Sequence, residues 1–167
     1  GLIVCATSPA MNHLYDLICQ RASDEAAPFL IEPTGARYSY GDAFAWAGRY
    51  ANALRAAGVK VGDRVAAQVE KSPAMLFLYL ACVRAGAIFL PLNTAYTLIE
   101  LEYFIGDAEP SLIVCDPSKL EGVRDIAKGA AIETLDKSGK GSLFDKAQAA
   151  SPDFENAERG PDDLAAI

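Results

Sequence analysis

Residues 83–93 read Val-Arg-Ala-Gly-Ala-Ile-Phe-Leu-Pro-Leu-Asn, and this stretch decides the fold class. A helix that runs to Arg84 ends at Gly86, a residue type that readily closes a helix. The following residues 87–92 are almost wholly apolar, which is typical of a strand whose two faces are both covered. Such strands belong to parallel sheets, so the stretch predicts an α/β protein.

The same alternation continues on both sides of this stretch. Upstream, residues 64–69 read as a strand, and Ser72-Pro73 supplies an N-cap and a first-turn proline for the helix that ends at Arg84. Downstream, Thr97-Leu-Ile-Glu100 is a capping box that opens a helix to about Asp107. The remaining elements are a buried strand at 111–115, a helix capped by Asp116-Pro117, a weaker strand at 132–135, a turn at 137–142, a short helix at 143–150 and a polar loop at 151–163. This order predicts a mostly parallel, right-handed sheet with crossover helices.

Different elements precede the alternation. Residues 11–21 predict a short amphipathic helix, and residues 28–32 and 36–39 predict a hairpin. Ser39 and Asp42 have capping-box spacing for a helix that stops at Gly58. We expect that helix to bury Phe44, Ala47, Ala51 and Leu54 on one face, with Trp46 and Tyr50 also packed.

Composition and charge exclude several classes of function. The chain has 167 residues, 51% of them hydrophobic, and a net charge of −7 without a local cluster of Lys or Arg. This balance disfavours binding to nucleic acid or to anionic lipid. The longest apolar stretch, residues 74–92, contains Arg84, Gly86 and Pro91, so we expect no membrane span.

Metal and nucleophile chemistry have few candidate residues here. The cysteines are far apart, with no pair at metal-binding spacing, and His13 is the single histidine. We expect no metal site, and we expect the cysteines to be small core residues of a reduced, cytoplasmic protein. The four cysteines are Cys5, Cys19, Cys82 and Cys115.

Three segments in order resemble the early motifs of the adenylate-forming superfamily, which includes acyl-CoA synthetases, peptide-synthetase adenylation domains and luciferases. They are Tyr38-Ser-Tyr-Gly-Asp-Ala-Phe44, Gly62-Asp-Arg-Val-Ala66 and the stretch at 83–93. The resemblance implies the N-terminal domain of that fold. It also implies an enzyme that uses ATP, magnesium and CoA to activate a small carboxylic acid.

A narrower resemblance, over residues 11–167, is to malonyl-CoA synthetases, the ligases for malonate and methylmalonate. It is carried by Gln68–Ser72, Pro91–Thr97, Tyr103–Pro110, Glu133–Leu135 and Asp162–Ile167. It implies conversion of malonate or methylmalonate, ATP and CoA to the acyl-CoA, AMP and pyrophosphate. The rival interpretations are a relative that takes a medium-chain, aryl or amino acid, and a non-enzymatic α/β module that binds a partner protein.

In that family a Ser/Thr/Gly-rich phosphate loop follows the segment equivalent to Asp162–Ile167, and this sequence contains no such loop. The Gly-rich residues 138–142 lack the spacing of a P-loop, and we interpret them as a solvated turn. We therefore assign no catalytic residue, expect the isolated chain to be inactive and expect exposed apolar surface to cause self-association. Residues 11–167 are expected to be an incomplete N-terminal subdomain whose partner is the rest of the enzyme. Residues 1–10 are treated as an extension of doubtful origin, with Met11 as the natural start.

The remaining candidates follow the strand at 87–92. Asn93, Thr94 and Tyr96 follow the carboxyl end of that strand, where ligands of α/β proteins bind. They are therefore candidates to support a nucleotide site by holding the residues that contact the nucleotide. The favoured alternative is that Asn93 and Thr94 satisfy backbone groups while Thr97 caps the next helix.

Overall fold

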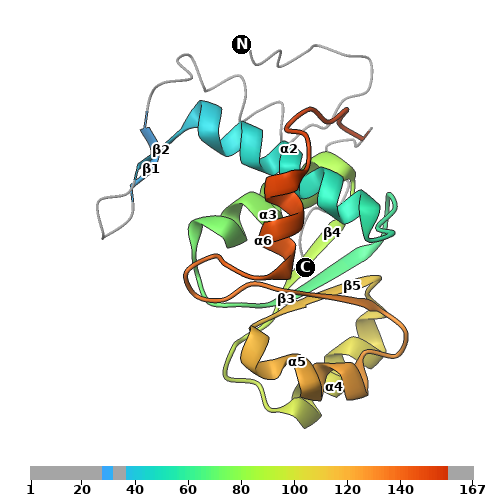
Figure 1. Cartoon of the computed structure of the whole chain (residues 1–167). Coiled ribbons are helices and arrows are strands. Elements are labelled where there is room, and N and C mark those ends of the chain that lie inside the picture. The colour runs from blue at the N-terminus through green and yellow to red at the C-terminus, as the bar shows by residue number, and fades with distance from the viewer. Residues whose placement is uncertain (1–27, 32–36, 158–167) are drawn as a thin grey trace.

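The computed structural model describes residues 28–31 and 37–157. The helix predicted at 11–21 lies outside the described residues, as do residues 1–10, His13, Cys5, Cys19 and the end of the loop at 151–163. The order of elements along the described chain is strand, strand, helix, and then an alternation of strands and helices (Figure 1).

The centre of the structure is a four-stranded sheet in the order β4-β3-β5-β6. All its neighbouring strands run parallel, with Val65 opposite both Phe89 and Leu112, and Leu112 opposite Ala131. The predicted parallel sheet is confirmed. The strands are β3 (Arg64–Gln68), β4 (Ile88–Pro91), β5 (Leu112–Cys115) and β6 (Ala131–Thr134).

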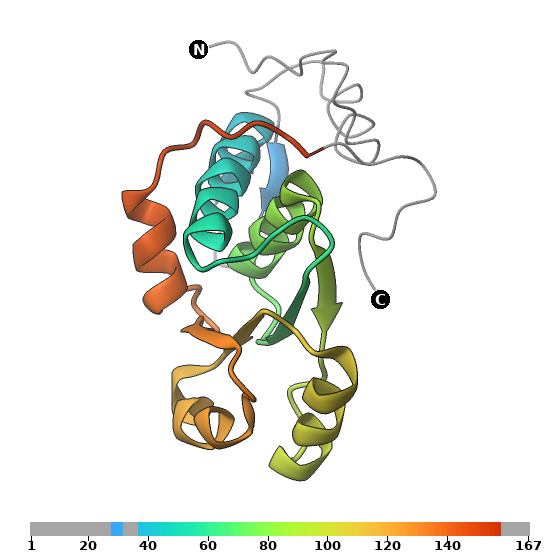
Figure 2. The same cartoon turned by 90° about the vertical axis from the view of Figure 1, so that its right-hand side faces the viewer.

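Helices cover both faces of this sheet (Figures 1 and 2). Three of them lie on one face: α2 (Tyr40–Ala56), α3 (Pro73–Ala85) and α6 (Ser142–Ala149). The other face carries α4 (Leu98–Ala108) and α5 (Leu120–Ile126), with a 3-10 turn at Pro117–Lys119 before α5. The result is a three-layer α/β unit.

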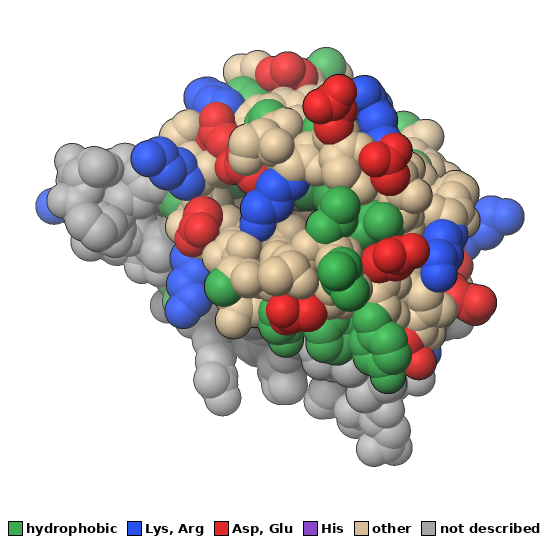
Figure 3. Space-filling model, turned by 90° about the horizontal axis from the view of Figure 1, so that it is seen from below, with side chains coloured by type: hydrophobic (Ala, Val, Ile, Leu, Met, Phe, Trp, Pro, Cys, Tyr) green, Lys and Arg blue, Asp and Glu red, His purple; other side chains and the backbone are tan. Residues whose placement is uncertain are grey.

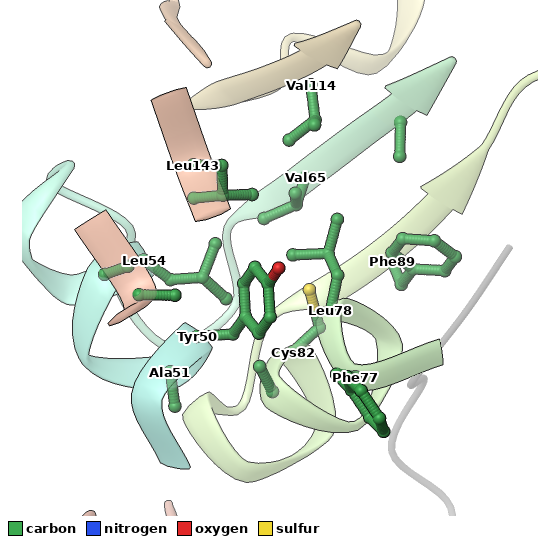
Figure 4. Close-up of a cluster of buried hydrophobic side chains, with 14 of the residues drawn as sticks. Tyr50, Ala51, Leu54, Val65, Phe77, Leu78, Cys82, Phe89, Val114 and Leu143 are labelled. Atoms are coloured by element: carbon green, nitrogen blue, oxygen red, sulfur yellow. The ribbon is translucent and has the colours of Figure 1, made fainter. Parts of the chain in front are cut away.

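Alternate residues of the central strands supply two separate cores. Val65 and Ala67 of β3 join the cluster under α2, α3 and α6, while Ala66 joins the cluster under α4 and α5. Figure 4 shows the first cluster, in which Leu54, Leu78 and Leu143 meet Val65 and Val114 of the sheet. Because side chains alternate across a strand, covering both faces buries every residue of β5.

The predicted helix starts are confirmed by their caps. The Ser39 backbone N–H donates to Asp42 Oδ2 at 2.9 Å, and the Asp42 N–H donates to Ser39 Oγ at 3.0 Å, which completes the capping box of α2. Ser72 Oγ accepts from the Met75 N–H at 3.2 Å, and Gly86 closes α3 in the left-handed conformation with φ of 70°. These caps satisfy backbone groups that the helix itself leaves unpaired.

The predicted hairpin is also confirmed. Strands β1 (Pro28–Ile31) and β2 (Arg37–Ser39) pair antiparallel, with Ile31 opposite Arg37. The expected burial of helix α2 holds as well, since Phe44, Ala47, Ala51 and Leu54 are all buried. Tyr50 is buried, and Trp46 stacks with Phe144 at 5.5 Å between ring centroids.

One expectation about the deciding stretch is wrong. Residues 87–92 were expected to be covered on both faces, but Ile88 and Leu90 are half-buried and Pro91 is exposed. The reason is position, because β4 is an edge strand of the described sheet and pairs only with β3 there. Proline is tolerated at such an edge because it lacks the N–H that a second neighbouring strand would need.

Helix α4 also leaves apolar side chains on its outer surface. Ile99 is 81% exposed and Tyr103 is 71% exposed. Figure 3 views this end of the molecule and shows hydrophobic side chains gathered among charged ones. Among the described helices, none combines the length and apolar character needed to cross a bilayer.

Replacing Leu78 by alanine tests the first core. The Leu78 side chain is fully buried between α3 and the sheet, so Leu78→Ala should lower the free energy of unfolding by about 3 kcal/mol through lost burial and a cavity. The measurement is chemical denaturation. Ile99→Ala removes a similar side chain from the exposed face of α4 and should change the free energy by less than about 0.5 kcal/mol. Equal losses in the two variants would contradict the assigned core.

Candidate functional site

The candidate residues lie in the loop between β4 and α4, at the carboxyl edge of the sheet. Asn93 is exposed, whereas Thr94 and Tyr96 are half-buried. The structure therefore brings the three residues together in one short loop, at the edge where ligands of open α/β sheets bind. Their individual contacts determine what this loop can do.

Several polar groups of the loop bind within the loop or at the start of α4. Asn93 Oδ1 accepts from the Ala95 N–H at 2.9 Å, and Thr97 Oγ1 accepts from the Glu100 N–H at 3.2 Å to cap α4. The Tyr96 ring stacks on Phe104 of α4 with centroids 4.9 Å apart. These contacts match the backbone role that we favoured for Asn93 and the capping role that we favoured for Thr97.

Sequence reasoning missed the residue that holds this loop in place. Gln68 ends β3 and is only 1% exposed. Its Nε2 donates to the carbonyl oxygens of Asn93 at 3.0 Å and Tyr96 at 3.3 Å, so one buried amide ties both ends of the loop to the sheet. The available signal was a polar residue closing an otherwise apolar strand, since buried polar groups need partners.

A second tie comes from the other side of the loop. Lys119, in the 3-10 turn after β5, donates from Nζ to the Thr94 carbonyl oxygen at 2.7 Å. The loop after β4 is thus fixed to the loop after β5, and the carboxyl ends of these two strands form one connected surface. Asp116, at the start of that turn, accepts from the Ser118 N–H at 2.9 Å.

Gln68→Met should loosen the loop while preserving the volume of the side chain. The carbonyl oxygens of Asn93 and Tyr96 would both lose a donor, so we expect the free energy of unfolding to fall by about 2 kcal/mol. Hydrogen exchange of the Ala95 amide should become faster. In Lys119→Met, which removes a single half-buried donor, the loss should stay below about 1 kcal/mol. Unchanged exchange at Ala95 in the Gln68 variant would show that Gln68 does not hold the loop.

The Gly-rich turn at 138–142 does not fit a phosphate group. The backbone N–H groups of Ser138 and Lys140 both donate to Asp136 Oδ1, at 2.8 and 3.0 Å, and Gly139 N–H donates to the Asp136 carbonyl oxygen at 3.0 Å. A phosphate cradle needs such N–H groups free to face the anion. Here the carboxylate and the backbone carbonyl of Asp136 already accept from these three groups, which confirms the interpretation of this segment as a turn.

The same contacts make the turn sensitive to acid. Hydrogen bonds from the Ser138 hydroxyl and then from the Lys140 backbone N–H hold the pKa of Asp136 below its ordinary value of 3.8. A lowered pKa means that the folded turn favours the ionised form. The stabilisation is therefore complete above the unfolded value and is lost as pH falls through the folded pKa.

An NMR pH titration tests this turn directly. The amide shifts of Ser138 and Lys140 should move together with a midpoint below 3.8, because both groups report the protonation of Asp136. In Asp136→Asn the shared titration should disappear. A midpoint at or above 3.8 in the unaltered chain would contradict the hydrogen-bonded turn.

The buried carboxylate of Glu133 also has a structural role. Ser142 Oγ donates to Glu133 Oε2 at 2.6 Å, and Lys146 pairs with the other carboxylate oxygen. Glu133 is 5% exposed, so this pairing offsets the cost of burying its charge. The group therefore joins β6 to α6.

The described cysteines are inert core residues, as expected. Cys82 and Cys115 are both fully buried and carry free thiols. Burial raises the pKa of the Cys82 thiol, and burial followed by the Asp116 carboxylate raises the pKa of Cys115 to about 11. Within residues 37–157 and the first hairpin strand, His, Cys, Asp and Glu form no group of three that could hold a metal ion.

Three surface hollows of the described part are lined by residues outside the candidate loop. One hollow of about 100 Å³ lies between α2, α3 and the turn before α6, lined by Trp46, Phe77 and Phe144. Two others border α4 beside Lys128, one of them at the amino ends of β5 and β6. The described contacts of the candidate loop are therefore hydrogen bonds and ring packing that fix the loop at the sheet edge.

Comparison with known proteins identifies the family. The family model for AMP-binding enzymes matches residues 19–167, which is most of the chain. The chain belongs to the AMP-binding enzyme family. This match confirms the adenylate-forming resemblance that the segments at 38–44, 62–66 and 83–93 indicated.

Solved structures of this family share the fold. The chain is 52% identical to MatB from Rhodopseudomonas palustris, a malonyl-CoA synthetase, with a TM-score of 0.90 over 93% of this chain and 32% of that one. MatB has been solved both without ligand and with ATP bound. A fatty acyl-CoA synthetase from Mycobacterium tuberculosis is 26% identical, with a TM-score of 0.83 over 96% of this chain and 33% of that one.

One curated relative is named for a different acid. A feruloyl-CoA synthase from an Amycolatopsis species is 39% identical over 95 residues, which are 57% of this chain and 19% of that protein. The chain thus spans about a fifth of this curated relative and about a third of the solved ones.

Proposed function

We propose that this chain is the N-terminal part of a malonyl-CoA synthetase. The complete enzyme converts malonate or methylmalonate, ATP and CoA to the acyl-CoA, AMP and pyrophosphate, with magnesium as the cation, in the cytoplasm. The observation that carries the proposal is the 52% identity to MatB across 93% of this chain. Identity of this level extends well beyond the short motifs that all adenylate-forming enzymes have in common.

A second candidate function is the activation of an aryl acid such as ferulate. It is favoured by the 39% identity to feruloyl-CoA synthase, which covers 57% of this chain. The match to MatB is both higher and longer, so we favour malonate. The match to an enzyme family over residues 19–167 weighs against a non-enzymatic interaction module.

Within this proposal the described residues provide a scaffold. The carboxyl-edge loop is tied by Gln68 and Lys119, and in the turn at 138–142 Asp136 accepts from the first three backbone N–H groups. ATP, magnesium and CoA would therefore bind chiefly to residues outside the described part. Asn93, Thr94 and Tyr96 would support that site indirectly, because their loop would hold neighbouring residues in place.

A substrate panel with the complete protein tests the proposal. With ATP, magnesium and CoA, malonate should release pyrophosphate at least about tenfold faster than ferulate, a medium-chain fatty acid or an amino acid, and mass spectrometry should detect malonyl-CoA. A tenfold difference corresponds to about 1.4 kcal/mol of discrimination in the transition state. Preference for ferulate would establish the aryl-acid alternative instead.

The isolated 167-residue chain provides the matched control. Under the same conditions it should release no pyrophosphate above background with any of these acids, because the sequence contains no phosphate loop of the family type. Turnover by the isolated chain would mean that the described scaffold binds and activates ATP itself.

A further inference from the structure

Residues 150–157, which we call the strap, cross α2 outside any regular element. Figure 2 shows the strap in red, running from α6 across α2 towards α3. Its residues form neither helix nor strand, so its backbone carbonyl groups have no ladder of their own. Such groups need partners from elsewhere in the protein.

Two side chains of α2 supply part of these partners. Asn52 Nδ2 donates to the carbonyl oxygens of Ser151 and Asp153, each at 2.8 Å. Arg49 Nη1 donates to the carbonyl oxygen of Ala150 at 2.5 Å. The first half of the strap is therefore bound along the side of α2.

Arg84 binds both the second half of the strap and α2, and all three of its guanidinium nitrogens donate a hydrogen bond. Nη2 donates to the Phe154 carbonyl oxygen at 2.6 Å, Nε donates to Asn156 Oδ1 at 2.6 Å, and Nη1 donates to the Phe44 carbonyl oxygen of α2 at 3.3 Å. The backbone carbonyl of Arg84 also accepts from the Ala157 N–H at 2.7 Å. One residue thus joins α2, α3 and the strap.

Gly48 makes room for this arrangement. A Cβ atom built at Gly48 would lie 1.8 Å from the Pro152 carbonyl oxygen and 3.0 Å from Arg84 Nη1. A glycine inside a helix normally costs about 1 kcal/mol relative to alanine. Here the missing side chain is what allows the strap backbone to contact α2.

We propose that Arg84 is a positioning residue of the ligase, acting through the strap. Arg84 lies in the stretch at 83–93 that also forms β4 and leads into the carboxyl-edge loop, and the strap holds the last described residues of the chain. By fixing the strap to α2 and α3, Arg84 sets where the following part of the enzyme stands relative to the sheet edge. This inference rests on the proposed function, since only a larger enzyme has a part to be positioned.

The geometry distinguishes arginine from a simple positive charge. The three guanidinium nitrogens donate to three separate acceptors, whereas a lysine has one ammonium on a flexible stem. Arg84→Lys should therefore weaken the binding of the strap almost as much as Arg84→Met. If charge alone mattered, the lysine variant would behave like the unaltered protein.

The test uses two readouts. In the 167-residue chain, hydrogen exchange of the Ala157 amide should become at least about tenfold faster in Arg84→Met and Arg84→Lys, with little change in the β5 amides. In the complete enzyme, assayed where each variant is fully folded, kcat for acid-dependent pyrophosphate exchange should fall about tenfold or more, since small misplacements of reacting groups are costly. The hydrogen-exchange measurement does not require an active enzyme.

Glycine variants supply a matched pair if the Arg84 variants do not fold. Gly48→Ala should speed exchange at Ala157 and lower Tm. Gly106→Ala, in α4, meets only the movable Lys128 Nζ at 2.9 Å and should leave both values unchanged or raise Tm. If Gly106→Ala sped exchange at Ala157 and lowered Tm more than Gly48→Ala did, the proposed role of the strap would be overturned.

The remaining outcomes separate the two proposals. If the Arg84 variants show faster hydrogen exchange at Ala157 but an unchanged kcat, the positioning role is overturned and Arg84 is a structural residue. Unchanged exchange at Ala157 overturns the anchoring itself. If the unaltered complete protein activates none of the acids, the proposed function fails and the positioning role fails with it, while the exchange data still decide whether Arg84 anchors the strap.

Discussion

Burial of β3 and β5 from both faces is the constraint on which the rest of the structure depends. Each central strand sends alternate side chains into two separate cores, one under α2, α3 and α6 and one under α4 and α5. Neither helix layer could form its core without the strand residues that face it. The strands in turn have apolar residues on both faces, which only a covered sheet can bury.

This arrangement also explains how the carboxyl edge is organised. A sheet covered on both faces leaves its polar chemistry to the loops that follow its strands. In this chain those loops are held largely by internal hydrogen bonds. Gln68 and Lys119 donate to the loop after β4, and Asp136 accepts from backbone N–H groups within the turn before α6. These hydrogen bonds fix the positions of the loops relative to the sheet and to one another.

Local signals were sufficient for elements whose ends are set by neighbouring residues. The capping box of Ser39 and Asp42, the Ser72-Pro73 helix start and the left-handed Gly86 all depend on contacts within a few residues. Local patterns could not reveal that β4 is an edge strand, because an apolar run reads alike at the edge and in the centre of a sheet. The ties made by Gln68 and Arg84 join residues 25 to 72 positions apart, and no local pattern predicts such partners.

The sequence by itself determined the fold class, the order of strands and helices, and the family, because these follow from hydrophobic periodicity, capping residues and short ordered motifs. Only the tertiary structure decided which polar residues hold the loops and the strap. It showed that Gln68 binds the loop after β4, that Asp136 fills the turn at 138–142 and that Gly48 lets the strap approach α2. The physical reason is that hydrogen-bond partners and close backbone approaches are set by distances in space, which the packing of distant segments creates.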